Sequence, residues 1–142
     1  MIMKKTSSAI FLLLFLFLSF IRCEKDKTDL LLGQWEGISE RTVNYIDNQL
    51  VHDSTYTYEP EEFVMEILDG GTCKIYKYGK LDKTWGWKVD DDIFSLIQGN
   101  NSRGAKYIVS ETSLTMDFTS EWKEQESKYK RIFYYVFRRI SP

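Results

Sequence analysis

The chain is short of the residues from which most enzyme and metal sites are built. Its 142 residues include one histidine, two cysteines and two prolines. One histidine and two cysteines cannot complete a closed zinc site or a disulfide framework. The lone His52 stands beside Asp53, and neighbouring residues on a strand point to opposite faces, which argues against a catalytic His-Asp pair. The sequence therefore predicts neither an enzyme nor a metal or cofactor site.

Long apolar runs are also missing beyond the first 22 residues. There, an unbroken apolar run at 9–18 follows two lysines and precedes Cys23. A membrane-spanning helix needs about 20 apolar residues, so this run is too short. The order of charged, apolar and cleavage regions predicts that residues 1–22 are a secretory signal peptide, with an uncleaved signal anchor as the alternative.

The position of Cys23 resembles the acceptor cysteine of bacterial lipoproteins. In that family the cysteine is diacylated on sulfur and becomes the first mature residue. The resemblance implies a lipid anchor on Cys23, followed by a charged tether, "EKDKTD", within residues 23–30. It also implies the cell envelope of a Gram-negative bacterium, with the protein anchored to the outer membrane and either periplasmic or surface-exposed. The membrane is thus one predicted partner.

Positive charge is scarce in the mature chain. Removing residues 1–22 takes away two lysines and Arg22, which leaves 16 Lys and Arg against 21 Asp and Glu, a formal net charge of −5. This balance argues against nucleic acid as a partner. The mature chain of about 120 residues is the usual size of one domain with its own core. No pattern in it specifies an oligomeric state.

The remaining sequence is typical of β-structure. No segment keeps a helical period for more than two turns, whereas short β-rich runs separated by turn residues recur to the C-terminus. Connections this short pair successive strands as an antiparallel meander, and eight or nine such strands hide their edges by closing. We therefore predict an all-β fold, an antiparallel meander β-barrel of about eight strands in residues 31–142. The strands are expected near 34–45, 50–58, 62–68, 72–78, 83–89, 93–98, 105–110, 113–120 and 129–140.

Alternation along the strands assigns the interior of this barrel. Apolar residues recur at every second position in several strands, so each of these strands has one apolar face that can be buried. A barrel of about eight strands is either filled by its side chains or holds one small ligand. The candidate contacts for a small apolar or amphipathic ligand are the large inward side chains: Phe63, Met65, Trp85, Trp87, Met116 and Phe118.

Four stretches together resemble the lipocalin family and its bacterial lipocalin-like domains. They are "LLGQWEGI", with Gly33 and Trp35, then "TWGWKVDDDIFSLI", "KYIVSETSLTMDF" and the closing "YYVFRRI", and they span most of residues 31–140. The resemblance implies that an arginine of the last strand, Arg138 or Arg139, packs over Trp35 and shuts one end of the barrel. Typical lipocalins place a long lid after the first strand, whereas this chain is expected to have a tight hairpin there.

Exposed aromatic residues support a different kind of function. Trp122 lies in what we expect to be a charged connection, "EWKEQESKY", while four tyrosines alternate along two predicted strands. If these rings are exposed, the protein is a non-catalytic interaction module that binds a glycan or a protein partner. The alternative for Trp122 is that it folds over one end of the barrel. The tyrosines concerned are Tyr56, Tyr58, Tyr76 and Tyr78.

Overall fold

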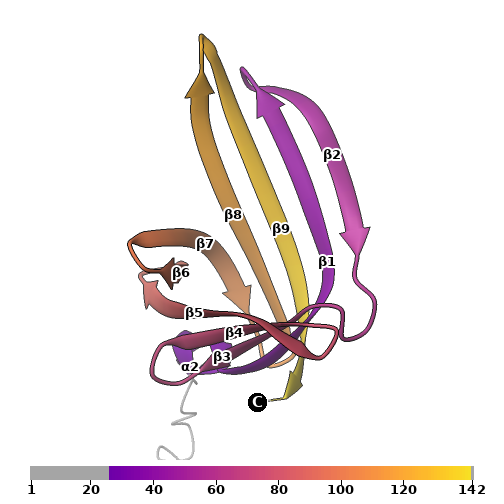
Figure 1. Ribbon diagram of the computed structural model, residues 1–142, viewed down its shortest axis with the longest axis vertical. Coiled ribbons are helices and arrows are strands. Elements are labelled where there is room, and N and C mark those ends of the chain that lie inside the picture. Colours follow the sequence, from indigo (N-terminus) through magenta and orange to yellow (C-terminus); the bar gives the residue numbers. More distant parts are fainter. Residues whose placement is uncertain (1–25, 142) are drawn as a thin grey trace, which may run out of the picture.

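The computed structural model describes residues 26–141, so the predicted signal peptide and Cys23 lie outside the described residues. One short helix and nine strands follow one another in this part of the chain (Figure 1). Their bounds lie close to the predicted strands. They are α2 (Lys27–Leu31), β1 (Gly33–Ile46), β2 (Gln49–Thr57), β3 (Val64–Leu68), β4 (Thr72–Lys77), β5 (Lys80–Asp90), β6 (Ile93–Gln98), β7 (Asn101–Val109), β8 (Ser113–Glu124) and β9 (Ser127–Ser141).

Eight of the strands form a closed antiparallel barrel, which confirms the predicted fold class. From β3 to β9 each strand pairs with the next in sequence. The ring closes on β1, whose first residues pair with β3 on one side and with β9 on the other. Strand β2 stays outside the ring and pairs with the second half of β1. The architecture is consistent with the lipocalin-like barrel that the sequence predicts.

Three of the strands are longer than the barrel requires. The β1–β3 pairing ends at Glu36, and the β7–β8 pairing ends at Phe118, yet β1, β8 and β9 all continue. Beyond these points the strand order is β2-β1-β9-β8, a four-stranded sheet that extends away from the barrel (Figure 1). We call residues 39–57 and 119–136 the projecting sheet.

The projecting sheet corrects one sequence prediction. The stretch "EWKEQESKY" is not a charged connection, because β8 runs on to Glu124 and β9 begins at Ser127. Trp122 is therefore a strand residue far from either end of the barrel. The hairpin between β1 and β2 is tight, as predicted, and its turn residues Asp47 and Asn48 both have positive φ.

The end of the barrel at α2 is closed by buried side chains. Asp26 caps the helix by accepting a hydrogen bond from the Thr28 amide, and Leu31 is fully buried against Trp35. Gly33 then turns the chain into β1 with φ +121°, a conformation that favours glycine. Part of the stretch predicted as a solvated tether thus belongs to the folded domain. Five residues of helix are too short to give a recognisable helical period in the sequence.

The thiol of Cys73 lies in this core. It is fully buried, and burial raises its pKa to about 12. Because only the thiolate reacts with alkylating agents, we expect Cys73 to resist iodoacetamide at pH 8 in the folded protein. It should be alkylated rapidly in denaturant, as mass spectrometry can measure. Equal labelling rates with and without denaturant would contradict the burial.

Candidate functional site

Trp35 and Arg139 hold the closed end together. The Arg139 guanidinium lies 4.2 Å from the centre of the Trp35 ring, and the indole Nε1 donates to the Leu31 carbonyl at 2.8 Å. Arg139 also donates to the carbonyls of Leu30, Leu32 and Glu111, the last two at 2.7 Å. Of the two arginines that the resemblance left open, Arg139 is therefore the one that covers Trp35. This constellation joins α2 to β1 and β9.

Arg138 points to the other side of β9 and pairs with the buried carboxylate of Glu36. Its Nη2 lies 2.5 Å from Oε2 of Glu36, which is only 5% exposed. The other oxygen of Glu36 accepts from the Glu61 amide at 2.9 Å. That backbone hydrogen bond, together with Arg138, holds the pKa of Glu36 below its usual range despite the opposing effect of burial. The group ties the β2–β3 loop to the barrel and has a structural role.

A pocket of about 200 Å³ opens at the opposite end of the barrel. Five of the six predicted contacts line it, and they come from β3, β5, β8 and the loop before β3. Their binding role stays a prediction, whereas their convergence is a property of the structure. The five are Phe63, Met65, Trp85, Met116 and Phe118.

Trp87 is the predicted contact that the structure places elsewhere. It stacks on Phe94 with ring centres 5.8 Å apart, and its Nε1 donates to the Leu68 carbonyl at 2.8 Å. Strand β5 runs from the open end to the closed end, so Trp87 lies one step deeper than Trp85 on the same face. It fills the core instead of lining the pocket.

Three cations line the mouth of this pocket on the side of β4, β5 and β7. Lys77, Lys83 and Arg103 all line it, as does one acid, Asp82. Asp82 lies 3.6 Å from Lys77, and Arg103 lies 5.7 Å from the centre of the Phe118 ring. Neither Lys83 nor Arg103 has an ion-pair partner within residues 26–141. The mouth is thus positively charged, although the chain as a whole carries a formal charge of −2.

The sequence analysis did not single out these cations, although a signal exists. Lys83 stands two residues before Trp85, and Arg103 stands two residues before the buried Ala105. Period-two spacing therefore places both on the inward face. A lysine or arginine at an inward-facing position near the end of a strand therefore indicates where the barrel opens to solvent.

Two half-buried phenols, those of Tyr58 and Tyr135, lie between the pocket and the projecting sheet. The Tyr58 hydroxyl donates to Glu40 at 2.7 Å, and burial together with this bond raises the pKa of Tyr58. Burial also raises the pKa of Tyr135 to about 12. Both phenols are neutral near pH 7, so they offer polar but uncharged groups beside the pocket.

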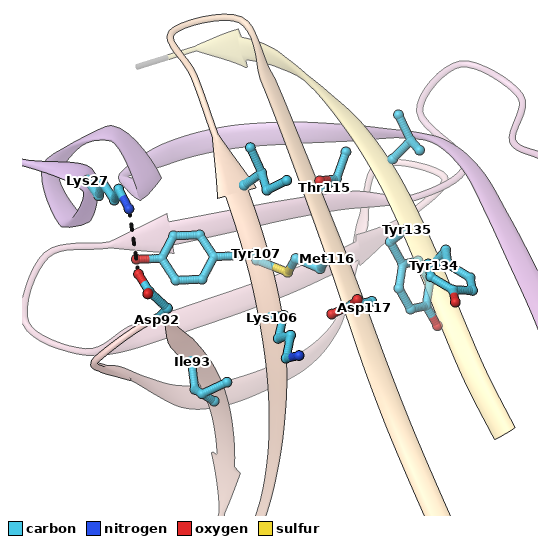
Figure 2. A pocket seen from close by; sticks show the side chains of 12 residues that line it. Lys27, Asp92, Ile93, Lys106, Tyr107, Thr115, Met116, Asp117, Tyr134 and Tyr135 are labelled. Atoms are coloured by element: carbon cyan, nitrogen blue, oxygen red, sulfur yellow. Dashed lines mark ion pairs between the residues drawn. The ribbon is translucent and has the colours of Figure 1, made fainter. Parts of the chain in front are cut away.

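A second, more open groove of about 620 Å³ follows the outer surface of β7, β8 and β9 (Figure 2). Met116 is buried in the barrel, so its neighbours Thr115 and Asp117 face outward into this groove. At one end Lys27 lies 3.5 Å from Asp92. Ile108, which is 78% exposed, forms part of its wall. The groove is an open surface feature lined by both polar and apolar side chains.

The residues that could support catalysis are dispersed. His52 is exposed on β2, and its Nε2 lies 2.9 Å from the Ser54 hydroxyl. The neighbouring Asp53 pairs instead with Arg41 at 2.6 Å. Among the described residues, no three His, Cys, Asp or Glu side chains come together as a metal site would require. The described residues also contain no helix that is long and apolar enough to cross a membrane.

The fold and the pocket define the class of protein. It is a closed eight-stranded antiparallel meander barrel with one shut end, one cationic open end and an extra strand on a projecting sheet. No family model, curated protein or solved structure matches the chain.

Proposed function

We propose that the barrel binds a small amphipathic molecule at its open end, in the manner of a lipocalin-like protein. The observation that carries the proposal is the convergence of five large apolar side chains in a pocket that three cations also line. A pocket of about 200 Å³ has the volume of six or seven waters at ~30 Å³ each, so it takes the end of a short apolar chain. Burial of that chain contributes about 25 cal/mol per Å².

The charge of the mouth favours a ligand with an anionic head group. Lys83 and Arg103 come from different strands and lie at the rim of the same pocket. A carboxylate held between them gains charge-assisted hydrogen bonds, while the apolar part remains in the pocket below. An uncharged molecule of the same length lacks this contribution.

Isothermal titration calorimetry with decanoate and with decanol tests this function. We expect decanoate to bind at least about tenfold more tightly. Met116→Trp should fill the pocket and abolish binding of both molecules, while Ile108→Trp adds the same ring on the outer surface as the matched control. Equal binding by these two variants would place the ligand outside the barrel. Arg103→Glu should remove only the preference for the carboxylate.

We also propose that the barrel is held at the outer membrane by acyl chains on Cys23. The first described residue, Asp26, lies three positions after Cys23 and caps α2 at the closed end. Three residues span at most about 10 Å, so such an anchor attaches the closed end to the bilayer and leaves the open end facing away. The intact mass of the purified protein tests this, because diacylation at Cys23 adds the mass of a diacylglyceryl group to a chain that begins at that residue.

A further inference from the structure

One carboxylate beside the pocket is held in place without a cation of its own. Glu40 of β1 is half-buried and makes no ion pair within residues 26–141. Its oxygens accept hydrogen bonds from the hydroxyls of Tyr58 at 2.7 Å and Thr42 at 3.4 Å. Hydroxyl donors fix the position of a carboxylate but do not neutralise its charge. The Glu40 carboxylate is therefore available to a cationic group from another molecule.

Glu40 lies on the same inward face as the pocket. The β1–β9 register pairs it directly with Tyr135, and side chains of such a pair stand on one face with Cβ atoms about 5 Å apart. Tyr135 pairs in turn with Met116 of β8, and both of these residues line the pocket. Glu40 thus lies beside the wall of the pocket, at the base of the projecting sheet.

Arg103 lies on the other side of the same phenol. In the strand order, β1 and β7 stand on either side of β9 and β8. The Arg103 guanidinium is 5.7 Å from the centre of the Phe118 ring, which is 5.9 Å from the centre of the Tyr135 ring. Burial and Glu40 raise the pKa of Tyr135, whereas Arg103 lowers it. Two opposite charges therefore flank Tyr135 without pairing with each other.

This separation of charges is selective for a ligand. Partly buried charges are normally paired, because an unpaired charge away from water is costly. The rings of Phe118 and Tyr135 lie between Arg103 and Glu40 and keep these two side chains apart. A ligand with an anion alone leaves the Glu40 carboxylate uncompensated. A ligand that carries both charges compensates both side chains at once.

We propose that the mouth of the pocket binds a zwitterionic head group, with its anion at Arg103 and its ammonium group at Glu40. This inference rests on the proposed function, since the apolar chain of the same ligand occupies the pocket. The rings of Tyr58 and Tyr135 lie beside Glu40 and can add cation–π attraction to a quaternary ammonium group. Because two rings separate the protein charges, a head group whose charges are joined by a short linker, such as phosphocholine, fits best.

Isothermal titration calorimetry of the full chain with decylphosphocholine and with decanoate tests this assignment. Glu40→Gln keeps the shape of the side chain and an acceptor for Tyr58 but removes the charge. It should raise the dissociation constant of decylphosphocholine at least about tenfold without weakening decanoate. The matched control is Asp117→Asn, which removes a carboxylate from the outward face of β8 beside Met116 and should leave both constants unchanged.

The other outcomes separate this inference from the proposed function. Binding of decanoate but not decylphosphocholine overturns the inference alone, whereas binding of neither overturns both. Equal weakening of the two probes by Glu40→Gln, or a similar effect of Asp117→Asn, also overturns it.

A measurement on the unaltered protein is decisive if Glu40→Gln loses the native circular dichroism spectrum. Bound decylphosphocholine should show nuclear Overhauser effects between its ammonium methyl groups and the rings of Tyr58 and Tyr135. Contacts of these methyl groups with the β4–β5 side of the mouth instead would show that the inference is wrong.

Discussion

Replacing Trp35 by alanine is expected to lower the free energy of unfolding by about 3–5 kcal/mol. Trp35 is fully buried, its indole donates to the Leu31 carbonyl, and its ring carries the Arg139 guanidinium. The substitution therefore opens a cavity and leaves a buried carbonyl without its donor. Urea unfolding followed by circular dichroism measures the loss as a shift in midpoint.

The matched control is Trp122→Ala, which removes the same side chain from the exposed end of β8. Its ring contacts Tyr129 and Arg131 but closes no cavity, so we expect a loss of at most about 1.5 kcal/mol. Similar midpoints for the two variants would show that Trp35 does not hold the core at the closed end.

Replacing Arg139 by lysine is expected to cost about 2 kcal/mol and to release α2. A lysine keeps the charge but cannot donate from a planar fork to Leu30, Leu32 and Glu111 while it covers Trp35. The helix then loses its attachment to β9. Hydrogen exchange should show faster exchange at the Leu30 and Leu32 amides, whose bonds define the helix.

Arg103→Lys is the control for this effect, because Arg103 lies over the Phe118 ring at the open end without equivalent carbonyl bonds. It should leave the α2 amides protected. Protection of α2 in Arg139→Lys as well would mean that Leu31 and Trp35 alone hold the helix.

The fold was largely predictable because local signals agree with each other. The tight turn at Asp47 and Asn48 and the alternation through Met65 and Met116 both specify an antiparallel meander. The barrel then follows from the absence of elements that cover a sheet. The predicted strand boundaries agree best with the structure where one face of the strand is buried, because burial produces the alternation of apolar and polar residues.

The projecting sheet was not predictable, because the end of its β8–β9 hairpin lacks the burial that produces this alternation. Between Trp122 and Tyr129 both faces of the hairpin meet solvent, so charged residues occupy most positions and the alternation disappears. The sequence left the choice between Arg138 and Arg139 open for a related reason. Aromatic residues stand on both sides of β9, so only the structure reveals that Arg139 shares the inward face.

The pocket was predictable in its lining but not in its depth or charge. Alternation identifies the face of each side chain, yet it does not say how far along the barrel axis that residue lies. Trp85 and Trp87 share a face, but only Trp85 reaches the pocket. The depth of a residue depends on the tilt and stagger of the strands, which arise from the closed sheet as a whole.

The pairing of β1 with β9 also determines when the barrel can form. Residues at the two ends of the domain meet in this ladder, for instance Gln34 with Ser141. Contacts so distant in sequence have a high contact order, which slows folding to milliseconds or longer. Until β9 has been synthesised, the long edges of β1 and β8 have no partner and are open to aggregation. A chain that ends before β9 is therefore an open sheet with two unprotected edges, not a smaller barrel.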